Sequence, residues 1–525
     1  MARTDETGAR RGGFLDAVER FGDRLPDPVF IFVWLIGILM VMSAVAAFAQ
    51  FTAVNPITGE TLMAQSLFSR DNVQRLLTSM PDTLTSFTPL GLTLVIMLGA
   101  GVAERSGLFS AALRAGLRNA PKAAMTPIVM LLALVATHSS DAAYVVLIPL
   151  SGVIYASVGR HPIAGIAAAF AGVSGGFSAN FMPGPIDALI LGVTEPAVHI
   201  IDPTWTVNVA GNWYFILGMA IVFFPIGWFV TDRIIEPRLG TYTPTGDTPL
   251  SSQKGDSQLT APERKGLWLA LIGFLGVTGL WLILTFGPGQ YLQIPGAPWD
   301  QRLNPMLDSL IAYFFLLFLI CGVCFGIPTG TIKSHRDVVR MSTEAMKDMA
   351  GYIVLAFTAA HFVVMLNWTG LGAITAIHGA EAVQSAGLPA PLLLAVMVLL
   401  AATLNLVVGS ASAKWAFMAP FLVPMLMILG ISPEMTTAAY RVGDSVTNII
   451  TPLMVYFPMV LAFCRRWNPE FGMGGLLSNM LPYSFAFLIG GLALTIFWVW
   501  VGLPVGPGAP IGYVMPEGVT PAIGG

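Results

Sequence analysis

The chain has 525 residues, of which 55% are apolar and only 10% are charged, and its formal net charge is −3. This composition excludes a soluble globular domain, and the nearly neutral balance gives no basis for nucleic-acid binding. The three cysteines, Cys321, Cys324 and Cys464, lie in apolar or membrane-edge sequence and predict neither disulfides nor a metal site. The sequence therefore predicts an all-α polytopic membrane protein.

Apolar segments follow a polar start. Residues 1–27 are polar and charged and contain no cleavable signal peptide, so we expect a cytoplasmic N-terminus. A membrane-spanning helix needs about 20 mostly apolar residues. Nine stretches meet this need: 28–50, 86–104, 163–195, 209–231, 267–286, 307–326, 350–370, 436–462 and 478–502. Residues 123–158 and 390–429 are too long for one helix and are interrupted near the middle, which predicts two re-entrant helical hairpins.

The lysines and arginines orient these nine transmembrane helices. In the predicted order, 21 of the 26 fall on the side of the N-terminus, while only Arg70, Arg75 and Arg302 fall in loops on the other side. The positive-inside rule then places the N-terminus in the cytoplasm and the C-terminus outside, in a multi-pass protein of the bacterial inner membrane. Residues 503–525 are rich in Gly and Pro, and we expect a loosely ordered extracytoplasmic tail.

The connections between the spans are short. Residues 232–266 predict a flexible cytoplasmic linker without a domain of its own, followed by two connecting transmembrane helices within 267–326. Residues 106–120 predict an amphipathic interfacial helix with Arg114 and Arg118 on its wet face.

Two distant segments repeat one another. Residues 139–174 and 410–445 align without a gap at an offset of 271 positions, and nine of the 36 pairs are identical. Six identical pairs are small or helix-breaking residues: Ser139/Ser410, Pro149/Pro420, Gly159/Gly430, Pro162/Pro433, Gly172/Gly443 and Ser174/Ser445. Chance similarity is the alternative, but the charge pattern makes one hairpin enter from each side. We therefore predict an inverted repeat of units 86–231 and 350–502, which suits alternating access.

The second broken span carries polar residues that are costly in a membrane and are therefore functional candidates. Arg441, Asp444 and Asn448 are spaced i, i+3 and i+7, so on a continuous helix they share one face. Gly443 and Pro452 are expected to break the helix and to free carbonyl groups for a ligand. The alternative is an Arg441–Asp444 pair that neutralises itself and only locks two helices.

The tip of the second hairpin adds hydroxyl groups and an ammonium group. Gly409 allows a turn, Ser410 and Ser412 can cap the returning half-helix, and Lys414 and Trp415 follow at once. The N-terminal end of that half-helix favours an anion. A tip rich in Ser and Gly also occurs as a simple helix-packing contact.

A sodium site is predicted where this tip faces the broken span. Asn405, Gly409, Asp444 and Asn448 together offer one carboxylate, amide oxygens and a freed carbonyl, which are hard oxygen ligands.

The first half mirrors this arrangement. Ser139 and Asp141 lie in the first tip, and Asn180 lies in the Gly/Ser-rich break of the following span. Asp187, which follows a Pro-Gly-Pro sequence, is either a proton carrier or a loop carboxylate near the outer face. His138 and His361 can titrate near neutral pH, although a lone membrane histidine is more often a hydrogen-bonded packing residue.

Residues 139–149, 409–416 and 439–452 closely resemble segments of the AbgT family, the p-aminobenzoyl-glutamate transporters of bacteria, and the likeness runs from about residue 14 to 502. The resemblance implies a homodimeric secondary transporter rather than an enzyme. It implies sodium at Asn405, Gly409, Asp444 and Asn448. It implies transport roles for Asp187, Ser412, Trp415, Pro433, Arg441, Asp444 and Pro452.

The resemblance also implies a cargo. The family's substrates are p-aminobenzoyl-glutamate and, for some members, p-aminobenzoate and sulfonamide drugs moved outward. For such an aromatic carboxylate, Arg441 or Lys414 can hold the carboxylate and Trp415 can stack on the ring. Asp187 and Asp444 can couple binding to Na⁺ or to the proton-motive force. The alternative is a sodium-coupled dicarboxylate or citrate-type carrier, which would not need Trp415. A passive pore is disfavoured because its lining would be continuously polar.

Overall fold

The computed structural model describes residues 28–54, 59, 61–117, 124–137, 143–242, 259–297, 302–451, 454 and 456–514, and these residues are mostly helical. The helices in chain order are α2 (Pro28–Phe48), α3 (Arg70–Thr85), α4 (Thr88–Arg105), α5 (Leu108–Leu117), α6 (Met125–Ala136), α8 (Ile148–Ser157), α9 (Pro162–Phe170), α10 (Pro185–Val198), α11 (Trp213–Val230), α12 (Glu236–Leu239), α14 (Ala261–Phe286), α16 (Asn304–Asp308), α17 (Leu310–Thr329), α18 (His335–Asp348), α19 (Ala350–Thr369), α20 (Leu371–Ser385), α21 (Ala390–Asn405), α22 (Ala411–Ile428), α23 (Pro433–Val446), α24 (Phe457–Arg465) and α25 (Met473–Val501). Short π-helical segments, Ala143–Leu147, Ala171–Gly175 and Thr231–Ile235, adjoin α8, α9 and α11. Strands β1 (Thr52–Val54) and β2 (Thr61–Met63) pair antiparallel.

Eight helices of the described part are long and apolar enough to cross a membrane. Seven of them match predicted spans, and the eighth is α22, the returning arm of the second hairpin. The remaining two predicted spans are interrupted. Residues 163–195 form α9 and α10 with a break between them, and residues 436–462 form α23 and α24 in the same way. The expected all-α membrane fold is confirmed, and the count of nine spans stays a prediction.

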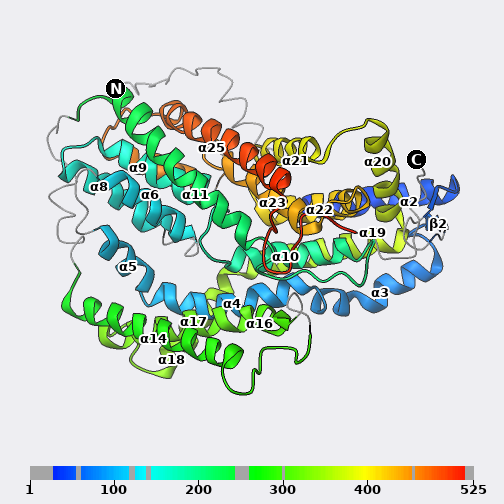
Figure 1. Ribbon diagram of the computed structural model, residues 1–525, viewed down its shortest axis with the longest axis horizontal. Helices are drawn as coiled ribbons and strands as arrows, with labels where there is room; N and C mark the ends of the chain where they lie inside the picture. Colours follow the sequence, from blue (N-terminus) through cyan, green and yellow to red (C-terminus); the bar gives the residue numbers. More distant parts are fainter. Residues whose placement is uncertain are drawn as a thin grey trace, which may run out of the picture.

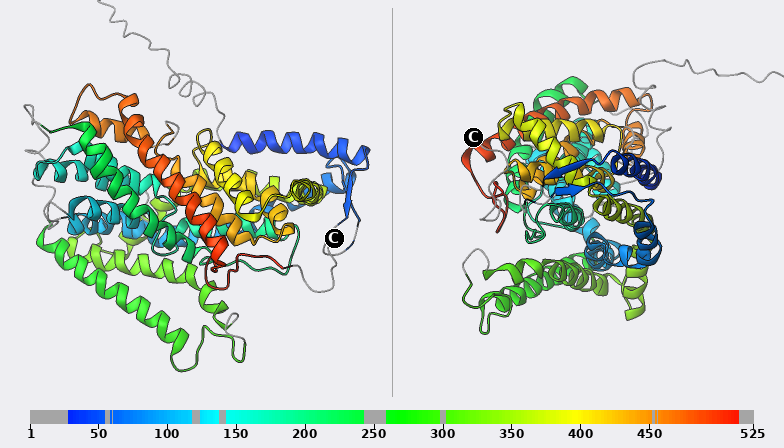
Figure 2. Two further views of the ribbon diagram at one scale, coloured as in Figure 1. Left: turned by 45° about the horizontal axis from the view of Figure 1, so that its top comes forward. Right: turned by 90° about the vertical axis from the view of Figure 1, so that its right-hand side faces the viewer.

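The helices form two adjoining groups. α4, α14, α17 and α18 pack together along one side of the molecule (Figure 1). The hairpin helices and the broken helices lie on the other side, with α11 and α25 packed against each other across them (Figures 1 and 2). α10 joins the groups because it contacts α4 on one side and α22 and α23 on the other. The site described below therefore lies inside the protein.

The two copies of the repeat begin a helix at equivalent prolines. Pro162 and Pro433 are the first residues of α9 and α23, where a missing N–H costs nothing. Each follows a capping side chain: His161 accepts a hydrogen bond from the Ile163 amide, and Ser432 accepts one from the Met435 amide. Gly159 and Gly430 precede these starts with φ angles of +74° and +82°, a conformation that favours glycine.

The second glycine shared by the two copies of the repeat has a packing role. A Cβ on Gly172 would lie 2.4 Å from the Cβ of Ala133 in α6, and one on Gly443 would lie 2.3 Å from the carbonyl oxygen of Val398 in α21. Each glycine thus lets a broken helix approach the first arm of its own hairpin. The prediction that Gly443 breaks its helix is wrong, because α23 continues through it to Val446.

Residues 503–514 of the tail after α25 are held by backbone hydrogen bonds. The Ser432 amide donates to the Ile511 carbonyl over 2.8 Å, the Tyr513 amide donates to Gly430 over 2.9 Å, and Phe215 donates to Val505 over 3.1 Å. The expectation of a loose tail is therefore wrong for residues 503–514, which hold the start of α23 by backbone hydrogen bonds. Residues 515–525 lie outside the described part of the chain.

The predicted helix is present as α5, while its place at the membrane interface stays a prediction and Arg118 lies outside the described residues. Arg114 pairs with Glu263 at the start of α14 over 2.6 Å. The counterpart of α5 in the second half is α20, because α20 follows Gly370 as α5 follows Gly107. The sequence pattern did not predict α20. The reason is its mixed composition, since α20 carries His378 and Glu381 among small residues.

Candidate functional site

The start of α10 fixes the position of Asp187. Pro185 is the first residue of this helix, and Asp187 lies in its first turn. The Gly184 amide donates to the Asp187 Oδ2 atom over 2.7 Å, so the carboxylate caps the helix where negative charge is favoured. Asp187 is buried, at 4% exposed, and belongs to a helix rather than to a loop.

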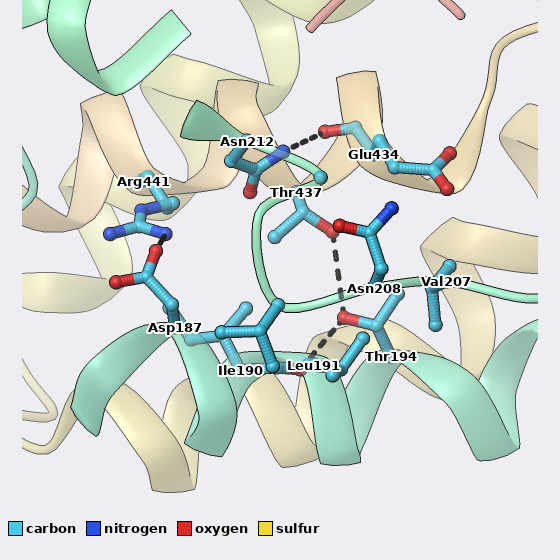
Figure 3. Close-up of a pocket in the computed structure, with 12 residues that line it drawn as sticks. Asp187, Ile190, Leu191, Thr194, Val207, Asn208, Asn212, Glu434, Thr437 and Arg441 are labelled. Atoms are coloured by element: carbon cyan, nitrogen blue, oxygen red, sulfur yellow. Dashed lines mark hydrogen bonds and ion pairs between the residues drawn. The ribbon is translucent and has the colours of Figure 1, made fainter. Parts of the chain in front are cut away.

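The charge partner of Asp187 comes from the other half of the molecule. Arg441 Nη1 on α23 donates to Asp187 Oδ1 on α10 (Figure 3), and the two side chains are 1% and 2% exposed. Arg441 Nε and Nη2 are buried and have no hydrogen-bond partner among the described residues. These two atoms form one edge of the guanidinium, which is suited to bidentate binding of a carboxylate. The pair therefore offers an anion-binding edge at the contact between the halves.

The ion pair lines a pocket between α10, α23 and the segment 207–212 (Figure 3). Thr194 and Thr437 face each other across it with hydroxyl oxygens 3.5 Å apart. The Asn212 amide group donates to the backbone carbonyl of Glu434 over 2.8 Å, and Trp205 donates its indole N–H to the Glu434 carboxylate over 3.2 Å. Both halves of the chain contribute polar groups to this pocket.

Sequence reasoning missed Thr194, Thr437 and Glu434 in this pocket. A signal for Thr194 existed, because it lies seven residues after Asp187 on one helix and so shares its face. Glu434 was excluded because the predicted span began at residue 436, whereas α23 begins at Pro433.

A second buried ion pair lies one turn further along α23. Lys414 Nζ lies 2.5 Å from Asp444 Oδ1, and both side chains are 1% exposed. The same ammonium group donates to Asn405 Oδ1. Because Lys414 is on α22, Asp444 on α23 and Asn405 at the end of α21, one ammonium group ties three helices together. Arg441 and Asp444 therefore do not pair with each other, and the self-neutralising alternative is wrong.

Asn405 organises the predicted sodium ligands. Its Nδ2 atom donates to the Asp444 carbonyl over 2.8 Å, to Thr447 Oγ1 over 2.9 Å and to Asn448 Oδ1 over 2.8 Å. Asn405, Asp444 and Asn448 are thus brought together as predicted, while Gly409 is exposed in the loop between α21 and α22. The oxygens of Asn405 and Asn448 and one oxygen of Asp444 already accept hydrogen bonds. This arrangement does not fit Na⁺, and sodium binding stays a prediction.

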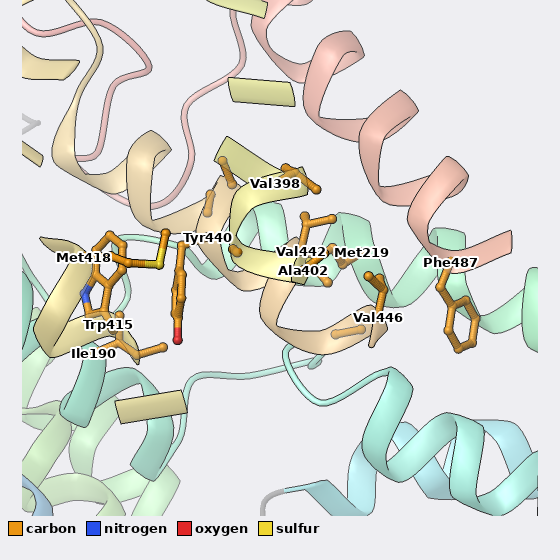
Figure 4. Packing of buried hydrophobic residues seen from close by; sticks show 14 of the residues in the cluster. Ile190, Met219, Val398, Ala402, Trp415, Met418, Tyr440, Val442, Val446 and Phe487 are labelled. Atoms are coloured by element: carbon orange, nitrogen blue, oxygen red, sulfur yellow. The ribbon is translucent and has the colours of Figure 1, made fainter. Parts of the chain in front are cut away.

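The indole of Trp415 is fully buried rather than presented to a cavity. It packs beside Tyr440 with ring centroids 4.4 Å apart (Figure 4), and its N–H donates to Thr194 over 2.9 Å. Tyr440 in turn donates to the Ala411 carbonyl over 2.6 Å. Stacking of Trp415 on a substrate ring stays a prediction, and in this conformation Trp415 supports the pocket through Thr194.

The second hairpin tip is capped as expected. Ser410 accepts a hydrogen bond from the Ala413 amide over 3.3 Å and lies 3.2 Å from the hydroxyl of Ser412. Pro433 is buried at the start of α23, on the wall that also carries Glu434.

The first hairpin is described only in part. Ser139, Asp141 and His138 lie outside the described residues, as does Pro452. At the near edge of this gap, Thr137 donates to Asn180 Oδ1, which links the end of α6 to the break before α10.

The two broken spans touch each other. The Ser178 amide donates to Ser445 Oγ over 3.0 Å, and the Asn448 side chain donates to the Ser174 carbonyl over 3.3 Å. Ser174 and Ser445 are partners in the sequence repeat, and each accepts a hydrogen bond from the other broken span. His361 donates its Nδ1–H to the Phe357 carbonyl over 2.7 Å, a hydrogen bond within its own helix.

Paired hairpins, broken helices that contact each other and a buried ion pair between the halves define a multi-pass membrane transport protein. The chain belongs to the AbgT family: the family model described as "AbgT putative transporter family" matches residues 13–513.

Known proteins agree with this assignment. The p-aminobenzoyl-glutamate transport protein of Escherichia coli K12 is 33% identical over 505 residues, which cover 96% of this chain and 97% of that protein. The structure of the YdaH transporter of Alcanivorax borkumensis superposes with a TM-score of 0.86 at 39% identity and covers 92% of this chain and 100% of that chain. The structure of MtrF of Neisseria gonorrhoeae, described within a class of antimetabolite efflux pumps, has a TM-score of 0.88 at 41% identity, with coverage of 95% and 100%. These relatives are transport proteins and not enzymes, as expected.

Proposed function

We propose that this protein is an ion-coupled secondary transporter of p-aminobenzoyl-glutamate, of p-aminobenzoate or of related antimetabolites, sulfonamides included. It works by alternating access in the bacterial inner membrane, as a homodimer with a cytoplasmic N-terminus. p-Aminobenzoyl-glutamate is taken from the E. coli relative and antimetabolites from the N. gonorrhoeae relative, whereas p-aminobenzoate and sulfonamides follow from the family resemblance. The observation that carries the proposal is the free edge of Arg441.

Arg441 is better placed than Lys414 to hold the substrate carboxylate. The ammonium of Lys414 is already bound to Asp444 and Asn405, whereas Arg441 keeps two buried donors for a ligand. Unpaired buried donors cost about 1–3 kcal/mol, so a carboxylate that satisfies them gains that free energy on binding. Arg441 is therefore the anion anchor in the proposed cycle.

The position of this anchor supports alternating access. Arg441 belongs to the second half and Asp187 to the first, so a ligand that binds this pair contacts both halves. A ligand shifts a conformational equilibrium only through different contacts in the two states. Any relative motion of α10 and α23 changes the contacts at this pair, which couples binding to the motion.

Uptake into proteoliposomes tests the proposal. Radiolabelled p-aminobenzoate and p-aminobenzoyl-glutamate are offered while a pH gradient and a sodium gradient are imposed separately. Accumulation driven by one gradient identifies both the cargo and the coupling ion. If neither compound moves under any gradient, the aromatic cargo is wrong and the dicarboxylate alternative takes its place.

Competition separates these two cargo classes without altering the protein. Excess unlabelled benzoate is expected to inhibit uptake of p-aminobenzoate more strongly than excess citrate or succinate. Replacement of Trp415 by Ala is a poor test, because removal of a fully buried indole destabilises a protein by about 3–5 kcal/mol whatever its cargo.

A further inference from the structure

Lys414 lies where a lysine is unfavourable unless its charge is needed. It is four residues into α22, close to the N-terminal end of a helix, where the helix dipole disfavours a cation. Its side chain is also among the most buried ionisable side chains of the described residues, at 1% exposed. Burial of a lone ammonium group is costly, so the surroundings of Lys414 must supply compensation.

The surroundings of this ammonium are those of a cation site. Asp444 supplies a carboxylate oxygen at 2.5 Å and Asn405 supplies its amide oxygen. α21 ends at Asn405, so the negative end of that helix also points toward the charge. The Tyr440 hydroxyl adds a contact of 3.3 Å to Asp444 Oδ1. Asp444 Oδ2 has no hydrogen-bond partner among the described residues and is fully buried.

We infer that the ammonium group of Lys414 is a built-in cation that occupies the predicted sodium site and excludes Na⁺ from it. A Na⁺ ion at Asp444 Oδ2 would share one carboxylate with the ammonium at Oδ1, and two cations this close repel each other strongly at this depth in the protein. Na⁺ can therefore bind Asn405, Asp444 and Asn448 only where the charge of Lys414 is absent or withdrawn. Removal of that charge by substitution turns the three residues into a sodium site.

This inference goes beyond the proposed transport function and does not depend on the cargo. It assigns to Lys414 the control of cation selectivity at the contact of α21, α22 and α23. The ammonium group is covalently attached to α22 through the Lys414 side chain, whereas a Na⁺ ion in its place is not attached to the hairpin.

The test measures sodium binding rather than transport. Purified wild-type protein and the Lys414→Met variant are compared for ²²Na⁺ binding in detergent and for melting temperature in NaCl and in choline chloride of equal ionic strength. We expect the variant to bind ²²Na⁺ at least about tenfold more tightly than the wild type, because the competing charge is gone. We also expect its melting temperature to fall in choline chloride and to recover in NaCl.

Two controls make the result specific. Arg441→Met also leaves a buried aspartate, Asp187, without its cation. Asp187 does not have the amide oxygens of Asn405 and Asn448 beside it, so the melting temperature of this variant should not respond to Na⁺. The double variant Lys414→Met/Asp444→Asn removes both charges and should be insensitive to Na⁺. If Lys414→Met cannot be purified, Lys414→Gln removes the same charge and retains a polar side chain.

Three results overturn the inference. The first is equal ²²Na⁺ affinity in the wild type and in the single variants Lys414→Met and Lys414→Gln. The second is a melting temperature of Arg441→Met that recovers in NaCl as much as that of Lys414→Met. The third is a melting temperature that does not respond to Na⁺ in either Lys414→Met or Lys414→Gln. No substrate is present in these measurements, so failure of the proposed cargo leaves them unaffected.

Discussion

Two buried ion pairs lie one turn apart on α23, and they are built for different tasks. Arg441 pairs with Asp187 of the first half, whereas Asp444 pairs with Lys414 of the neighbouring hairpin. The ammonium of Lys414 is bound by two side chains, but the guanidinium of Arg441 keeps one edge free. The Lys414–Asp444 pair joins helices within one half, whereas the Arg441–Asp187 pair leaves donors for a ligand between the halves. The donors that a buried charge pair leaves without a hydrogen bond therefore indicate whether the pair joins helices or binds a ligand.

The largest effect is expected from removal of Asp444, the acidic residue on α23, the helix that carries one residue of each ion pair. Asp444→Ala leaves the buried ammonium of Lys414 without its counter-charge, which destabilises a protein by about 3–5 kcal/mol. We expect transport in proteoliposomes to be abolished and the melting temperature to fall. Asp71→Ala, at an exposed position of α3, is the control and should leave both unchanged. Full activity of Asp444→Ala would remove Asp444 from the site.

Arg441→Lys sharpens the comparison because it keeps the charge and removes the free edge. The lysine can still pair with Asp187, so the melting temperature should change little. Loss of a bidentate, charge-assisted contact corresponds to about 1.5–3 kcal/mol, or roughly 10–100-fold in substrate affinity. Equilibrium binding of radiolabelled p-aminobenzoate measures this loss. An unchanged affinity would show that the carboxylate binds elsewhere.

Asp187→Asn separates charge pairing from ion coupling. The amide can still accept the Gly184 hydrogen bond, but it can neither balance Arg441 nor carry a proton. We expect uptake driven by a pH gradient to fall more than uptake driven by a sodium gradient. Equal rates for the wild type and the variant under a pH gradient would exclude Asp187 from proton coupling.

The smallest expected effects compare the two halves through their equivalent glycines. Gly172→Ala and Gly443→Ala each introduce a methyl group into occupied space, and overpacking of this kind costs about 1–3 kcal/mol. Gly443→Ala should be the worse of the two because it meets the backbone of Val398, which cannot rotate away. Gly276→Ala in α14, with nothing within 4 Å of the added group, is the control. Melting temperatures in detergent measure the order, and a neutral Gly443→Ala would contradict it.

The repeat could be predicted from the sequence because steric requirements restrict which residue types are allowed at particular positions. A left-handed backbone at Gly159 and Gly430, helix starts at Pro162 and Pro433, and close helix contact at Gly172 and Gly443 each restrict the residue allowed. Matching residues at one fixed offset therefore revealed the architecture. The assignment of Gly443 as a helix breaker failed because close packing and helix breaking demand the same residue.

The partners of the charged residues could not be predicted in the same way. Arg441 is three residues from Asp444 but pairs with Asp187, which is 254 residues away in the sequence. Local spacing gives no measure of such a distant contact, and it favoured the wrong partner. The ordered tail was missed for a related reason, since residues 503–514 are held by backbone hydrogen bonds to distant segments and show no helical periodicity.

One measurement tests the division of roles between the two pairs most directly. Equilibrium binding of radiolabelled p-aminobenzoate is compared in wild type, Arg441→Lys and Lys414→Met, all in NaCl. The proposed roles predict a loss of roughly 10–100-fold for Arg441→Lys and an affinity within about threefold of wild type for Lys414→Met. A loss of affinity in Lys414→Met equal to that in Arg441→Lys, or an unchanged affinity in Arg441→Lys, would contradict the assignment of the substrate carboxylate to Arg441 rather than to Lys414.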